Sequence, residues 1–134
     1  MKVFVDTVAW IALINRDDNL HSSAQQRLQS LFNDRAQLVT TELVLIEVAN
    51  ALAIPGRRLQ AYQFVQSLRQ LPMIQIVGIA EELLAEGWRL YGERGDKAWS
   101  LVDCVSFVVM EHEGIREAFT ADHHFRQAGF VTSF

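Results

Sequence analysis

Cysteine and basic residues are scarce in this sequence, and each shortage excludes a class of protein. The 134 residues include 1 cysteine, Cys104, so no internal disulfide can form, which fits a reducing compartment such as the cytoplasm. The formal net charge of −4 argues against a protein that coats nucleic-acid phosphates with a broad basic surface. Any contact with nucleic acid must therefore come from a local patch or a bound metal ion.

Long apolar runs are missing as well. The first run is closed by Arg16, Asp17 and Asp18 before it reaches the length of a membrane span, and no signal-peptide pattern precedes it. We therefore expect a cytoplasmic protein with no membrane partner. With 50% hydrophobic residues, the chain is long enough to bury a sizeable core, and we expect a single domain over residues 1–134.

Several motifs of other α/β enzymes are also absent. No Gly-x-Gly-x-x-Gly follows the first predicted strand and no Gly-Lys-Ser/Thr loop occurs, which argues against dinucleotide and P-loop functions. No Gly-x-Ser-x-Gly marks a nucleophilic serine. A dehalogenase-like phosphatase would need a second aspartate where Val8 stands, and no zinc spacing of cysteine or histidine is present.

The apolar patterning predicts strands that alternate with helices. Short strands are expected at 2–5, 38–39, 74–77 and 117–121, and helices at 10–14, 21–32, 43–53, 58–71, 80–91 and 100–113. A final loop holding His123 and His124 and a short strand complete the chain. This alternation predicts an α/β fold in which a central, mostly parallel sheet lies between helices, in three α/β/α layers.

Two of the predicted helices carry large apolar side chains whose direction matters. In the helix at 80–91 we expect Leu84, Trp88 and Tyr91 to point inward, with three glutamates on the solvated side. The helix at 59–71 has apolar positions that suit either a second copy of the chain or the chain's own core, and the core is the simpler interpretation.

Four carboxylates lie in apolar surroundings. Asp6 and Asp122 each follow a predicted strand, whereas Glu47 and Asp103 interrupt nearly apolar helices. An unpaired carboxylate in such a place costs several kcal/mol. Asp103 by itself can be explained as the third residue of a capping box that begins at Ser100. Four acids in such settings favour a shared cation instead.

Two of these acids fall where ligands collect in open parallel sheets, outside the carboxyl ends of the strands. Two charges about 5 Å apart repel by about 3 kcal/mol at an effective dielectric of about 20, so a cluster needs protonation or a cation. Mg²⁺ or Mn²⁺ suits all-oxygen ligands. Such a centre activates a water and stabilises charge on a phosphodiester, which predicts nucleic acid or a nucleotide as the substrate.

Other polar residues are candidates for supporting roles. Thr7, Ser100 and Thr120 can orient the carboxylates or metal-bound waters, although strand ends and caps also need such residues. His123 or His124 can contact a phosphate. The basic residues that can line the rim of the pocket are Arg57, Arg58, Arg94 and Lys97.

Four segments together resemble PIN-domain nucleases, especially the VapC-type toxins of prokaryotic toxin–antitoxin pairs. The matching segments are Val3–Thr7, Thr41–Ala53, Trp99–Cys104 and Phe119–Phe125. The resemblance spans essentially the whole chain and places the family's acidic quartet at Asp6, Glu47, Asp103 and Asp122. It places the family's threonine or serine partners at Thr7, Ser100 and Thr120, and an additional acid of some members at Asp96.

The resemblance implies a Mg²⁺- or Mn²⁺-dependent endoribonuclease, a hydrolase that cuts single-stranded or loop RNA with a metal-activated water as nucleophile. It also implies a homodimer and a tight complex with a small antitoxin. Two alternatives remain open. One is a catalytically silent PIN-like module that binds a partner protein, and the other is a nuclease acting on DNA, against which the lack of an inserted clamp argues.

Overall fold

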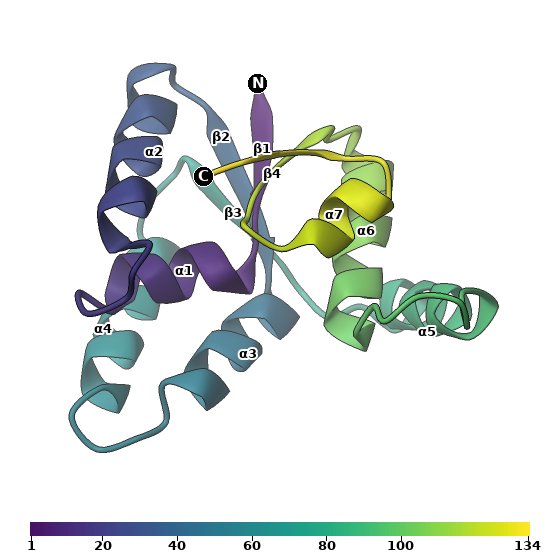
Figure 1. Ribbon diagram of the computed structural model, residues 1–134, viewed down its shortest axis with the longest axis horizontal. Helices are drawn as coiled ribbons and strands as arrows, with labels where there is room; N and C mark the ends of the chain where they lie inside the picture. Colours follow the sequence, from purple (N-terminus) through teal and green to yellow (C-terminus); the bar gives the residue numbers. More distant parts are fainter.

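The computed structural model describes all of residues 1–134 and contains one five-stranded sheet with helices on both sides (Figure 1). The strands are β1 (Lys2–Val5), β2 (Gln37–Thr41), β3 (Ile74–Val77), β4 (Glu117–Phe119) and β5 (Val131–Ser133). The helices are α1 (Thr7–Ile14), α2 (His21–Asn33), α3 (Glu42–Ala51), α4 (Arg58–Arg69), α5 (Glu81–Glu93), α6 (Leu101–Glu113) and α7 (His123–Gln127).

The sheet has the strand order β3-β2-β1-β4-β5, and every neighbouring pair is parallel. The prediction of a mostly parallel sheet is therefore confirmed, and the sheet has no antiparallel strand. The chain builds outward from β1 to β3 and then crosses back to place β4 on the other side of β1. This reversal of direction creates a switch point between the carboxyl ends of β1 and β4, where α/β sheets bind ligands.

The helices form the two outer layers of the expected three-layer fold. Figure 1 shows α1, α2, α3 and α4 to one side of the strands and α5, α6 and α7 to the other. The core is centred on the middle of the sheet, where Val3, Phe4 and Val5 of β1 are fully buried. Trp10 and Phe125 are also almost completely buried. No helix is both long and apolar enough to cross a lipid bilayer.

Local signals explain where the helices near the switch point begin and end. The Thr41 hydroxyl accepts from the Val44 N–H at 3.0 Å and caps α3. Ser100 and Asp103 form a reciprocal capping box at the start of α6. The same helix ends at Gly114, whose φ of 66° is a left-handed conformation that glycine adopts without a steric penalty.

Three expectations about helix faces and loops were wrong, two of them only in part, since Leu84 of α5 and Val65 and Leu68 of α4 do pack against the core. Trp88 and Tyr91 of α5 are half-exposed rather than inward, because the helix packs on α6 through the buried Gly87. Leu59 and Tyr62 of α4 are exposed and do not pack into the chain's own core. The segment with the two adjacent histidines is not a loop but the short helix α7, which begins after Asp122.

Candidate functional site

The four predicted acids come from four different elements that meet near the switch point. Asp6 directly follows β1 and lies beside β4, since its backbone N–H donates to the Phe119 carbonyl at 3.2 Å. Asp122 follows β4 after two residues and begins α7. Glu47 and Asp103 come from α3 and α6, the helices that reach this end of the sheet from opposite layers. Residues 116 positions apart in sequence, from Asp6 to Asp122, thus reach one locality.

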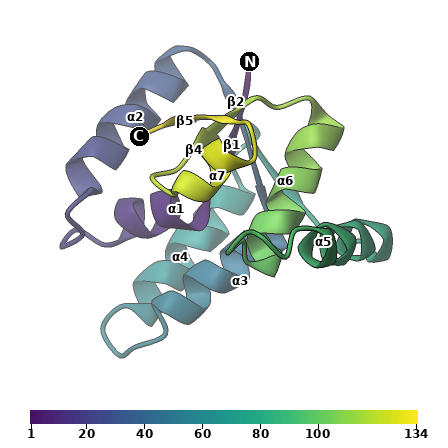
Figure 2. The same cartoon turned by 45° about the vertical axis from the view of Figure 1, so that its right-hand side comes forward.

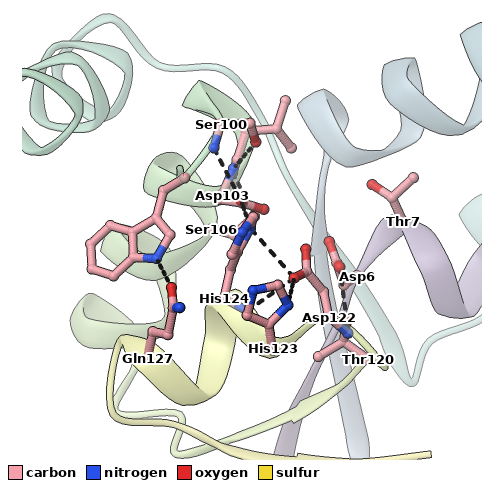
Figure 3. Close-up of polar contacts among 12 residues, drawn as sticks. Asp6, Thr7, Ser100, Asp103, Ser106, Thr120, Asp122, His123, His124 and Gln127 are labelled. Carbon is pink, nitrogen blue, oxygen red and sulfur yellow. Dashed lines mark hydrogen bonds and ion pairs between the residues drawn. The ribbon is translucent and has the colours of Figure 1, made fainter. Parts of the chain in front are cut away.

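Asp6 is the most buried of the four, with 3% of its surface exposed. Its Oδ2 accepts a hydrogen bond of 2.9 Å from the Thr120 hydroxyl (Figure 3). Burial raises the pKa of Asp6 to about 7, against hydrogen bonds from the Thr7 backbone and Thr120, and the charges of Asp103 and Glu47 raise it further. No lysine, arginine or histidine forms an ion pair with Asp6.

Glu47 is positioned by the residue next to Asp6. The Thr7 hydroxyl, in the first turn of α1, donates a hydrogen bond to Glu47 Oε1. The Glu47 carboxylate is partly buried, and its negative charge raises the pKa of Asp6. The predicted helix face of Glu47 therefore does turn toward the end of β1.

Asp103 has two sets of contacts. Its Oδ2 accepts the Ser100 backbone N–H at 3.1 Å, and its own N–H donates to the Ser100 hydroxyl at 3.0 Å. The same Oδ2 lies 2.9 Å from His124 Nδ1 (Figure 3). Burial raises the pKa of Asp103, the Ser100 N–H and His124 work against this, and the nearby Asp122 charge adds to it.

Asp122 joins β4 to α7 and is partly exposed. Its Oδ1 accepts the His124 backbone N–H at 2.9 Å and caps α7, while its own N–H donates to the Thr120 hydroxyl at 3.0 Å. The His124 ring nitrogen is 3.4 Å from the same Oδ1, and that of the more exposed His123 is 3.7 Å away. Asp122, His123 and His124 each place a ligand atom within 4.8 Å of the others.

The supporting residues behave differently from one another. Thr7 and Ser100 each hydrogen-bond one member of the acidic quartet and Thr120 hydrogen-bonds two, as expected of orienting residues. Asp96 instead pairs with Arg94, which lowers the pKa of Asp96 to about 2, and forms no hydrogen bond to the quartet. His124, rather than His123, contacts Asp103. No pattern in the sequence indicates that contact, because α7 has 5 residues, too few to show a helical period.

This arrangement suits a hard divalent cation. A buried carboxylate without a cationic side chain as partner, close to two further acids, leaves excess negative charge in a poorly solvated place. All four acids offer oxygen, the donor that Mg²⁺ and Mn²⁺ prefer. The geometry therefore supports the predicted chemistry of a cation held by carboxylates at the switch point.

Comparison with known protein families and curated proteins is consistent with this geometry. The PIN domain model matches residues 3–131. The 23S rRNA-specific endonuclease VapC20 of Mycobacterium tuberculosis, from strain H37Rv and from strain CDC 1551, is 30% identical over 132 residues. The match covers 96% of this chain and 95% of that protein.

Solved structures show the same architecture. The crystal structure of Mycobacterium tuberculosis VapC20, a sarcin-ricin loop cleaving toxin, superposes with a TM-score of 0.84 at 28% identity, covering 96% of both chains. VapBC2 from Rickettsia felis, solved with a promoter DNA fragment, superposes with a TM-score of 0.72 at 14% identity. The match covers 99% of this chain and 98% of that one. FitAcB from Neisseria gonorrhoeae superposes with a TM-score of 0.69 at 17% identity, and the match covers 100% of this chain and 97% of that one. The chain therefore belongs to the PIN-domain family and is similar over almost its whole length to a VapC toxin.

Proposed function

We propose that this protein is a metal-dependent endoribonuclease that hydrolyses phosphodiester bonds in RNA and acts as the toxin of a type II toxin–antitoxin pair. The observation that carries the proposal is the buried Asp6 carboxylate, which has no cationic side chain as partner and lies beside other acids at the switch point. The similarity to VapC20, an endonuclease specific for 23S rRNA, supports RNA as the substrate class.

The acidic quartet is proposed to hold Mg²⁺ or Mn²⁺. When bound, such a cation lowers the pKa of a water and offsets the charge of the phosphodiester. The chain's own contribution is orientation: Thr7 fixes Glu47, Thr120 fixes Asp6, and the backbone of residue 100 fixes Asp103. His124 limits the directions open to Asp103, because its ring lies 2.9 Å from the carboxylate.

A protein partner is proposed as well, in the form of a small antitoxin and a second copy of the chain. An open groove of about 540 Å³ runs between α3 and α4, and 8 of its 12 lining residues are hydrophobic. Leu59 and Tyr62 contribute more than half of their surface to solvent there. An exposed apolar surface of this kind is typical of an interface, and sedimentation of Leu59→Asp beside the wild type tests whether it joins two copies.

The test of catalysis uses antitoxin-free protein and a mixed cellular RNA pool. We expect cleavage with Mg²⁺ or Mn²⁺, none with EDTA, and none by a folded Asp103→Asn variant. Asp34→Asn is the matched control, because that acid is exposed at the C-terminal end of α2, outside the quartet, and the variant should cut like the wild type.

Three results would speak against the proposal. Equal cleavage by Asp103→Asn would point to a contaminating nuclease. Cleavage of single-stranded DNA in preference to RNA would support the DNA alternative. A metal-loaded protein that cuts neither, and whose cellular phenotype survives Asp6→Asn, would support the binding-module alternative.

A further inference from the structure

A cavity of about 610 Å³ lies between α5 and the segment that leads into α6. Trp88 and Tyr91 of α5 form one wall, and 55% and 49% of their surfaces are exposed. Their rings meet edge to face, with centroids 5.8 Å apart. Large aromatic side chains that cluster at a surface commonly mark a binding site, and these two take no part in the core.

The polar groups of this cavity are cationic. Arg94 and Lys97 line it, and no aspartate or glutamate does. The guanidinium carbon of Arg94 lies 5.0 Å from the ring centre of Trp99, and its nitrogens hold the solvent-exposed Asp96. Lys97 forms no ion pair. Asp96 offsets the charge of Arg94, so Lys97 supplies the net positive charge with which this cavity can attract an anion.

The cavity adjoins the acidic quartet. Figures 1 and 2 show the segment after α5 returning along that helix to the start of α6. Ser100 lines the end of the cavity, and its backbone N–H donates to Asp103 Oδ2 at 3.1 Å. A polymer whose phosphate lies at Asp103 can therefore pass Ser100 and place its next groups between the aromatic rings and Lys97.

Single-stranded RNA is the occupant that this chemistry fits. Proteins recognise unpaired bases by stacking them on aromatic rings, and they hold the backbone with nearby cations. Arginine and aromatic residues are common in protein interfaces too, but lysine is depleted there, so Lys97 is the residue of this cavity that favours RNA over a protein partner. Its volume of about 610 Å³ is also in the range of roughly 300–1,000 Å³ that holds a small ligand.

We propose that Trp88, Tyr91 and Lys97 form a stacking site for an unpaired base of the RNA, close to the phosphodiester that is cut. The proposal rests on the proposed function, because it assumes RNA as the substrate. It adds a specificity site: the base placed here is chosen by how well it stacks and fits, at a position outside the acidic quartet.

Binding is measured separately from cleavage, by fluorescence anisotropy of a labelled random-sequence 12-mer RNA with Mg²⁺, in an Asp6→Asn background. We expect Trp88→Ala or Tyr91→Ala to weaken binding by about fivefold to a hundredfold. Trp88→Phe, which keeps a ring, should retain most of the affinity. Lys97→Gln should reduce the slope of log K against log salt by about 0.7. Arg89→Gln, in a different cavity on the same helix, should change neither quantity.

A second measurement does not depend on any variant of the aromatic residues. RNA containing 4-thiouridine is irradiated with the protein, and the cross-linked peptide is identified by mass spectrometry. We expect the cross-link within residues 85–97. Cross-links confined to other segments would overturn the proposal.

The outcomes separate this proposal from the proposed function. If the wild type cuts RNA and a folded Trp88→Ala protein binds and cuts it equally well, the stacking site is refuted and the nuclease stands. If RNA binds through Trp88 but is never cut, the stacking site stands and the nuclease fails. If Trp88→Ala leaves RNA binding intact and lowers the sedimenting mass, the rings join copies of the chain and the proposal is overturned.

Discussion

Asp6 should make the metal-free protein less stable as the pH rises. Burial raises its pKa from 3.8 to about 7, so the native state keeps a proton that the unfolded chain releases within this window. Because the native state binds more protons here, the free energy of unfolding falls with increasing pH, and the loss is complete once the pH passes the folded pKa. At about 1.4 kcal/mol per pKa unit, the full loss is at most roughly 4 kcal/mol.

Asp6→Asn isolates this effect. Asparagine has nearly the same shape and can still accept the Thr120 hydroxyl, but it cannot ionise. In EDTA at pH 8 we expect the variant to be more stable than the wild type by about 2–4 kcal/mol. For a chain of this size that corresponds to roughly 7–14 °C in melting temperature. Near pH 4 the difference should disappear, and urea unfolding at a series of pH values measures it.

Adding the cation should make the wild type more stable than Asp6→Asn. Mg²⁺ or Mn²⁺ at about 1,000 times its Kd stabilises the wild type by about 4.1 kcal/mol, which offsets the deficit of about 2–4 kcal/mol, and should stabilise Asp6→Asn far less. Asp96→Asn is the control, since that acid is exposed and its pKa is lowered by Arg94, so it should not gain stability at pH 8. The reasoning is refuted if wild type and Asp6→Asn unfold alike at both pH values in EDTA.

Three further predictions concern single contacts. Thr7→Val removes the hydrogen bond to Glu47 and should lower RNA cleavage about tenfold in a kinetic assay, with little change in melting temperature. Gly87→Ala would place a Cβ 2.4 Å from Val105 Cγ2, so overpacking of about 1–3 kcal/mol should exceed the gain in helix propensity; the cost should shrink in a Val105→Ala background. Trp10→Phe loses a 3.1 Å bond to a buried threonine hydroxyl and should cost about 2 kcal/mol in urea unfolding, at an unchanged slope.

Hydrophobic patterning was sufficient to predict most of the elements and the setting of the acids. Asp6 follows three fully buried residues of β1, so its position at a strand end could be inferred from the sequence alone. Asp103 interrupts an apolar run too long for a strand, which predicted the helix α6. Convergence could be expected because parallel strands present their carboxyl ends at one edge.

The residues whose positions were predicted wrongly lie where the hydrophobic pattern carries little information. Gly87 has no side chain, so patterning could not show that α5 packs on α6 through it, and Trp88 and Tyr91 were assigned to the core instead. Likewise, α7 has 5 residues, too few to reveal a helical period, so the approach of His124 to Asp103 was hidden. Short helices and close backbone contacts leave little trace in a hydrophobic pattern.

Asp103 can serve both as a helix-capping residue and as a ligand of a cation, and its contact with Ser100 shows why. The capping box stabilises the start of α6, and the same hydrogen bond of 3.1 Å from the Ser100 N–H holds the carboxylate in place. A fixed carboxylate loses less conformational freedom when it binds a cation, so capping the helix also prepares the site. Asparagine at position 103 keeps an oxygen for the Ser100 N–H and removes only the charge. Loss of cleavage by Asp103→Asn would therefore report on the charge rather than on the helix cap.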